Sequence, residues 1–144
     1  MATLEGFAAL DRALGQLPKA TAKNVLRRVL KKAADPVDRE ASAAAPVLTG
    51  GLERCVFAGT RPTRSERKGA YLRTSNYYAE IHVGTSLGRG MFQEFGTFKD
   101  TPQPWFRPAW DATKNEALNI IKVTLGGEIE KAAKRYAKKL AKGA

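Results

Sequence analysis

The chain has 144 residues, of which 43% are hydrophobic and 27% charged; this balance is typical of a soluble globular protein and argues against wholesale disorder. The length fits a single domain, residues 1–144, with one core. Lys and Arg number 25 against 14 acidic residues, a net charge of +11, so we expect an acidic or polyanionic partner. The only cysteine, Cys55, excludes an intramolecular disulfide framework and a cysteine-based zinc site.

Targeting signals are not visible in the sequence. The first residues, "MATLEGFAALDRAL", lack the basic leader and the long apolar run of a signal peptide. No apolar stretch approaches the ~20 residues that span a bilayer. We therefore expect a protein that is assembled in a cytoplasm and has no membrane partner.

The N-terminal third has the spacing of helices. Residues 4–17 carry apolar side chains at roughly helical intervals, and Gly15 followed by Pro18 predicts a helix stop and a new start. From residue 19 a three-four rhythm of apolar residues continues for more than twenty positions, which predicts a long amphipathic helix with its lysines and arginines mostly on the other faces. Pro36 falls inside this rhythm and predicts either a kink near Asp35 or two abutting helices.

The middle of the chain is typical of a small sheet. A turn at Thr49, Gly50 and Gly51 leads into a β-like run that includes Leu52. Strands are then predicted at "YLRTS", "YYAEIHVG" and "MFQEF", which together make an antiparallel sheet packed against the helices. Residues 60–70 have no apolar pattern and predict an exposed basic hairpin arm, whose candidate contact residues are Arg61, Arg64, Arg67 and Lys68.

The C-terminal third begins with a proline-punctuated connector, residues 100–108, after which helical spacing returns from Trp110 to the end. Gly126 and Gly127 interrupt that rhythm, at about 1 kcal/mol per glycine relative to alanine. We therefore expect residues 127–144 to form a basic helical tail that separates from the main body. The predicted class is α+β, with a small antiparallel sheet packed against a long kinked N-terminal helix and a C-terminal helix.

The basic surplus is divided among three separated regions. Residues 19–40, 61–73 and 128–142 each carry a net charge of +4. Such a division suits a protein that touches several neighbours at least as well as one with a single binding groove. No recognised module for reading nucleic acid is present, so binding to DNA or RNA would be sequence-independent and sensitive to salt.

The sequence gives little support for an enzyme. His82 is the only histidine, which excludes a two-histidine metal site, and there is no nucleophile elbow or phosphate-binding loop. Glu94, between two phenylalanines, is the one carboxylate that needs an explanation. Burial would raise its pKa, as in acid catalysts, whereas a nearby arginine would make it part of a structural ion pair. Because no second carboxylate stands at a predictable spacing, we expect no catalysis, cofactor, metal or small-molecule substrate.

Two stretches, "AAAPVLTGGLERCV" and "GRGMFQEFGTFKDTPQPWFRPAW", resemble the paired motifs of the gene-ten-product family of tail-completion, or head-tail joining, proteins of long-tailed phages and phage-derived particles. The family patterns are A-P-x-x-T-G-x-L and Y-x-x-F-V-E-F-G-T, the latter followed by a proline-rich step and P-F-[LF]-R-P-A. Leu48 departs from the first pattern, where a basic residue is usual, and Trp105 stands beside the usual aromatic of the second. The resemblance covers roughly residues 4–125. The candidate assembly residues that it marks are Pro46, Thr49, Gly50, Leu52, Phe92, Glu94, Phe95, Gly96, Thr97, Pro104, Trp105, Phe106, Arg107 and Pro108.

The resemblance implies a structural protein of the virion neck. Several copies, expected to be six, would form a ring between the connector or stopper below the capsid and the end of the tail tube. Rings use contacts between unlike faces of identical subunits, which agrees with dispersed interaction surfaces. The basic faces would meet acidic neck proteins or, non-specifically, the double-stranded DNA that passes through. The alternatives are a tail terminator ring that ends tube growth and, in a different class, a basic nucleic-acid-binding protein.

Overall fold

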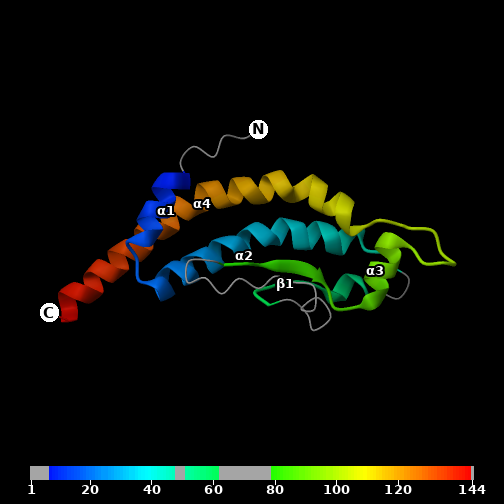
Figure 1. Ribbon diagram of the computed structural model, residues 1–144, viewed down its shortest axis with the longest axis horizontal. Coiled ribbons are helices and arrows are strands. Elements are labelled where there is room, and N and C mark those ends of the chain that lie inside the picture. Colours follow the sequence, from blue (N-terminus) through cyan, green and yellow to red (C-terminus); the bar gives the residue numbers. More distant parts are fainter. Residues whose placement is uncertain (1–6, 48–50, 62–78, 144) are drawn as a thin grey trace.

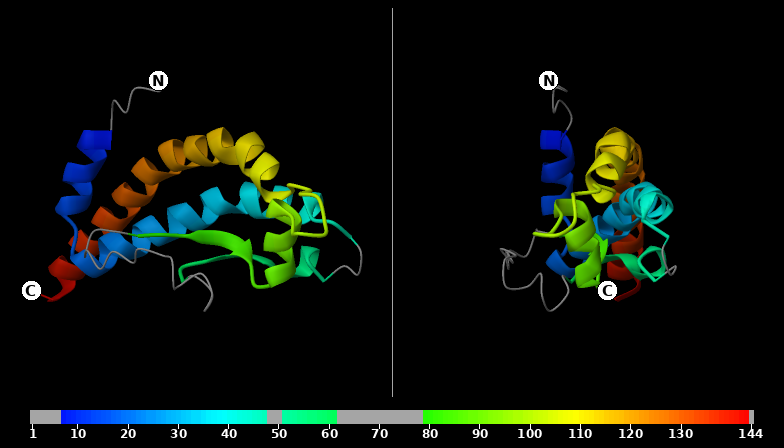
Figure 2. Two further views of the ribbon diagram at one scale, coloured as in Figure 1. Left: turned by 45° about the vertical axis from the view of Figure 1, so that its right-hand side comes forward. Right: turned by 90° about the vertical axis from the view of Figure 1, so that its right-hand side faces the viewer.

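Two long helices, α2 (Lys19–Ala44) and α4 (Phe106–Gly143), lie side by side and form the body of the protein (Figure 1). The computed structural model describes residues 7–47, 51–61 and 79–143. The remaining elements are helix α1 (Phe7–Gly15), the 3-10 turn η1 (Glu53–Cys55), strands β1 (Val56–Gly59) and β2 (His82–Thr85), and helix α3 (Gly88–Phe95). Helix α2 lies between α4 and the two strands (Figure 2), so the predicted α+β class is confirmed.

Helix α2 forms because its apolar residues recur at the predicted three-four spacing and bury one face. The buried residues are small, and this lets α4 approach closely. Pro36 is itself buried, and the chain remains helical on both sides of it, so the expected alternative of two abutting helices is wrong. The buried face consists of Ala22, Val25, Val29, Ala33, Ala34, Pro36, Val37 and Ala41.

Helix α4 runs without a break through Gly126 and Gly127, contrary to the predicted interruption. Its core-facing stripe continues beyond the glycines, because Ile129 and Ala132 are still buried against α1 and α2. Only residues 133–142 are exposed throughout, and the helix end projects past the body (Figure 1). The segment that separates from the body is therefore shorter than the predicted 127–144; we call residues 133–142 the α4 extension.

The described part of the sheet is a single antiparallel pair. Val56 of β1 faces Thr85 of β2, and Gly59 faces His82. The predicted strand "YLRTS" and the first two residues of "YYAEIHVG" lie outside the described residues, as do residues 62–70 of the predicted basic arm, including Arg64, Arg67 and Lys68. Arg61, at the edge of the described segment, is exposed.

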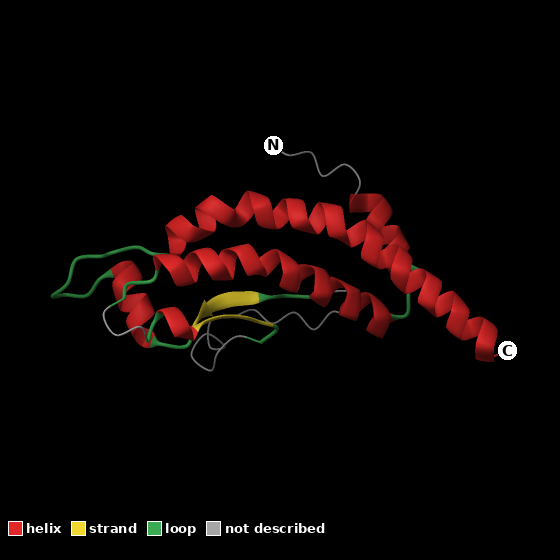
Figure 3. Cartoon of the chain, turned by 180° about the vertical axis from the view of Figure 1, so that it is seen from behind, coloured by secondary structure: helices red, strands yellow, loops and turns green. Residues whose placement is uncertain are grey.

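The prediction of a strand at "MFQEF" is wrong, because these residues form most of helix α3 (Figure 3). The helix ends at Gly96, whose φ of 76° places it in the left-handed region that favours glycine. The N–H of Gly96 donates a hydrogen bond of 2.8 Å to the carbonyl of Phe92, which satisfies one of the free carbonyls at the helix end.

The core extends along the body as three clusters. The first joins α1, α2 and the later part of α4, the second lies in the middle of the two long helices, and the third lies under α3. The third cluster fixes the start of α4 against the end of α2. It consists of Ala41, Ala45, Leu52, Trp105 and Ala109.

Candidate functional site

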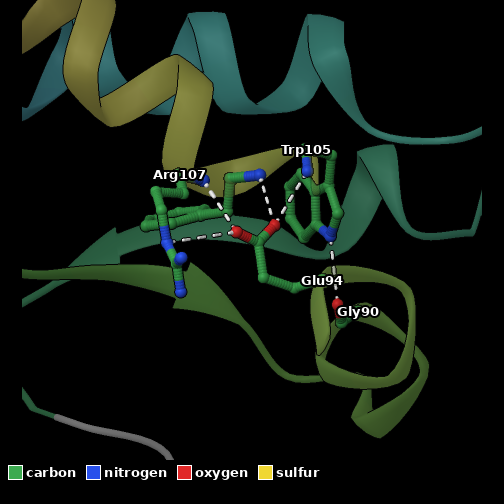
Figure 4. Close-up of polar contacts among 5 residues, drawn as sticks. Gly90, Glu94, Trp105 and Arg107 are labelled. Atoms are coloured by element: carbon green, nitrogen blue, oxygen red, sulfur yellow. Dashed lines mark hydrogen bonds and ion pairs between the residues drawn. The ribbon is translucent and has the colours of Figure 1, made fainter. Parts of the chain in front are cut away.

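The carboxylate of Glu94 lies at the N-terminus of α4 (Figure 4). Its Oε2 accepts hydrogen bonds of 2.8 Å from the backbone N–H groups of Trp105 and Phe106, and its Oε1 accepts one of 3.1 Å from the N–H of Arg107. The first N–H groups of a helix have no partner within that helix. Glu94 therefore caps α4 from a different helix, eleven to thirteen residues earlier in the chain.

The surroundings of Glu94 keep it ionised. Its side chain is only 9% exposed, and burial alone would raise its pKa. The N–H groups of Phe106, Trp105 and Arg107, together with the Arg107 charge, overcome this and hold the pKa of Glu94 below its ordinary value. The Arg107 Nε atom lies 4.0 Å from Glu94 Oε1, on a side chain that is 67% exposed. Because solvent weakens such an ion pair, the backbone N–H groups contribute more to the lowered pKa than Arg107 does. A carboxylate so fully engaged is a structural group and a poor general acid.

Trp105 belongs to the core of this chain. It is 4% exposed, its ring lies edge-on to Phe106 with centroids 5.6 Å apart, and its indole N–H donates a hydrogen bond of 3.0 Å to the carbonyl of Gly90. This hydrogen bond satisfies the one polar group of the buried ring. Trp105 thus fixes α3 to the start of α4 (Figure 4).

Gly90 lets the two motifs of the sequence come together. A Cβ at this position would lie 2.5 Å from Thr85 Cγ2, 3.0 Å from Leu52 Cδ1 and 3.2 Å from Trp105 Cζ2. Leu52 comes from the first motif and Trp105 from the second. Helix α3 can therefore lie this close to both only because residue 90 has no side chain.

The loop between α3 and α4 is held by short-range hydrogen bonds. The N–H of Thr97 donates to the carbonyl of Asp100 at 2.9 Å, and the N–H of Gln103 donates to the carbonyl of Gln93 at 2.8 Å. Gly96 is again required, because a Cβ there would lie 2.9 Å from Asp100 O and from Pro102. The loop carries Phe98 with its side chain fully exposed to solvent.

An open groove of about 680 Å³ lies beside the Glu94 cap, and we call it the tip groove. Met91 and Phe95, one helical turn apart on α3, line one part of it, and Trp110 of α4 lines another. These three side chains are 59%, 62% and 47% exposed. The guanidinium of Arg107 lies 5.7 Å from the centre of the Phe95 ring. The groove is therefore a mainly apolar surface whose one carboxylate is already engaged by the backbone.

The other candidate residues have different surroundings. Leu52 is buried and Pro46 is half-buried, whereas Thr49 and Gly50 lie outside the described residues. Pro104 and Pro108 are exposed. Pro108 lies in the first turn of α4, where backbone N–H groups make no hydrogen bond within the helix, so a proline is tolerated there. Sequence reasoning missed Gly90, Met91 and Trp110 as parts of this site. The spacing of Met91 and Phe95 was an available signal of a helical face.

The described residues thus form an elongated α+β body with an exposed apolar surface at the α3 end. Residues 8–96 match the family model described as "Bacteriophage HK97-gp10, putative tail-component". This match covers more than half of the chain, and the chain belongs to the HK97-gp10-like family of phage tail components. No curated protein and no solved structure matches it.

The family match has a defined extent. It includes α2, the first motif, both strands and α3, and it ends at Gly96, before the segment that starts α4. The resemblance to tail-completion proteins is confirmed at the level of the family. As a phage tail component, the protein is part of a virion and contacts other virion proteins. Within the described residues, no helix has the length and apolarity to cross a membrane.

Proposed function

We propose that this protein forms a ring at the head-proximal end of the tail and joins the tail to the head connector, continuing the conduit for DNA. The observation that supports this most strongly is the exposed apolar end around the tip groove. Soluble monomers rarely expose large contiguous apolar patches, and such patches mark interaction sites. Met91, Phe95 and Trp110 line the groove and are 47% to 62% exposed, and Phe92 of α3 and Phe98 of the following loop are exposed as well.

A structural role also fits the chemistry of the site. The candidate acid, Glu94, is ionised and engaged by three backbone N–H groups, so it has no free proton to donate. Its cap fixes the direction in which α4 leaves α3, and both helices line the tip groove. We infer that Glu94, Gly96 and Trp105 hold an assembly surface in place and that the chain is not an enzyme.

The basic surplus supports a location around the DNA path. Arg135, Lys138, Lys139 and Lys142 are spaced so that they share one face of the α4 extension, and they line a shallow hollow of about 300 Å³. In a ring of six copies, these faces would meet double-stranded DNA or acidic partner proteins of the neck. Non-specific DNA binding that fades by ~0.2 M salt is expected; binding that persists above it would favour a dedicated nucleic-acid-binding protein.

Deletion of the gene tests the proposed function. We expect electron microscopy of the lysate to show DNA-filled heads and separate tails of normal length, and expression of the intact chain in the same host to restore joined particles. Overlong tails would instead identify a tail terminator. Normal, joined virions without the protein would contradict both roles.

A further inference from the structure

The apolar stripe that packs α4 against the body continues into the α4 extension. Leu125, Ile129 and Ala132 are buried, and Tyr136 and Leu140 follow them at helical spacing on the same face. Tyr136 is 36% exposed and Leu140 is 58% exposed. A core-facing stripe therefore runs past the end of the core.

The space beside this stripe remains open. A groove of about 620 Å³ separates the α4 extension from the start of α2. Its lining combines Pro18, Thr21, Ala132, Tyr136 and Leu140 with the basic residues Arg28, Arg135 and Lys139. An apolar stripe next to an open groove fits an element from another molecule.

Helix α3, which lines the tip groove, lies at the opposite end of the protein from the α4 extension (Figures 1 and 3). The long body between them keeps one chain's extension away from its own tip groove. Contact between these two surfaces therefore requires two copies of the chain.

We infer that the α4 extension of one copy seats its Tyr136–Leu140 stripe against the tip groove of the next copy. This inference rests on the proposed ring and names the surfaces that close it. Tyr136 and Leu140 are one turn apart, about 6 Å along the helix axis, as are Met91 and Phe95 on the wall of the groove. An amphipathic helix that lays such anchors into an apolar groove is a recurrent mode of recognition.

Charge favours contact between unlike ends. Residues 88–111, which form the tip, contain three basic and three acidic residues, whereas residues 131–142 contain six basic and no acidic residues. Two basic α4 extensions would repel each other, whereas a tip with no net charge does not repel a basic extension. Arg135 and Lys139 flank the stripe and line the same groove as Tyr136 and Leu140, so they would lie at the rim of the contact. A head-to-tail contact of this kind closes into a ring if the rotation permits.

Two full-length variants test the contact. The tip variant carries Met91→Ser and Phe95→Ser, and the extension variant carries Tyr136→Ser and Leu140→Ser. Sedimentation should show larger assemblies for the unmodified chain, monomers for each variant alone, and 1:1 dimers in their mixture, because the mixture retains one intact contact. Val123→Ser, 72% exposed on the same helix, is the matched control and should assemble like the unmodified chain.

Other outcomes would overturn the inference. Self-association of the extension variant alone would show that two tips meet each other. An unmodified chain that stays monomeric up to about 1 mM, near the weak end of measurable affinities, would leave the groove to another virion protein. Thermal unfolding of each variant should stay cooperative, with a midpoint above the temperature of the sedimentation experiment, so that a loss of assembly is not a loss of the fold. If the unmodified chain restores joining in the deletion host but the mixture of variants gives no dimers, the inferred contact is wrong and the proposed function stands. If particles join without the protein, the proposed function is wrong, whatever the variants do.

Discussion

Glu94 makes the start of α4 depend on a single carboxylate. Glu94→Gln keeps the size of the side chain but turns an NH2 group towards N–H donors, so at least one of the three N–H groups loses its charged acceptor. We expect the free energy of unfolding in urea to fall by about 1–3 kcal/mol. Glu116→Gln, exposed on α4, is the control and should change it little. Equal stability of the two variants would show that the cap does not stabilise the fold.

The stability that Glu94 provides depends on pH. Its pKa is lower in the folded protein than the ordinary 4.5, so its contribution is complete above that value and is lost as the pH falls through the folded pKa. The difference in unfolding free energy between the unmodified chain and Glu94→Gln should therefore be constant near neutrality and shrink in acid. Asp38 has the opposite effect on the pH dependence, because burial and the nearby Asp35 raise its pKa. Since Asp38 is present in both proteins, its effect cancels in the difference. A difference that grows in acid would contradict the ionised cap.

Gly90 provides a steric test of the same site. Gly90→Ala places a methyl group 2.5 Å from Thr85 Cγ2 and should destabilise the protein by about 1–3 kcal/mol through overpacking. Gly88→Ala, in the same helix with nothing within 4 Å of the added carbon, should be tolerated. Thermal unfolding of the two variants measures the contrast, and equal midpoints would show that α3 does not pack as closely as described.

Sequence reasoning found several of these residues without finding what they contact. Glu94 stood out because a lone acid among aromatics needs a partner, but its partners are backbone N–H groups, which every residue has and no pattern marks. Trp105 could equally have faced a neighbouring subunit. Only the fold, which brings Leu52 and Gly90 to the indole, shows that it is a core residue.

Among the elements, the long helices were predictable and the short ones were not. More than twenty residues of apolar rhythm identify α2, because chance seldom maintains such a period. Helix α3 has only eight residues, and two of its first three are glycines, so its apolar residues are too few to distinguish a helical period from that of the predicted strand. Gly96 immediately after Phe95 was the available sign of a helix end.

Helix α4 also contains a testable weakness. Gly127 is an exposed helical glycine with nothing within 4 Å of an added Cβ. Ile129 and Ala132, which follow Gly127 in the helix, belong to the core, so the helix at Gly127 unfolds only when the whole protein unfolds. Gly127→Ala should raise the free energy of unfolding by up to about 1 kcal/mol, measured in urea. A decrease would indicate that the helix needs a bend at this position.

For the whole molecule, composition and motif resemblance indicated the class of protein, and the family match confirms it. The elongated shape, with an apolar groove at one end and a basic extension at the other, depends on long-range packing that no local pattern contains. This shape supplies the unlike ends that a ring of identical subunits requires.

A symmetric reconstruction of the virion neck tests the central claim most directly. We expect a ring of this fold, in six copies, between the connector and the head-proximal end of the tail tube. Each α4 extension should meet the tip groove of the adjacent copy, and the basic faces should be directed at DNA or at acidic neck proteins. A virion whose neck lacks this protein, or which carries it only elsewhere along the tail, would contradict the account.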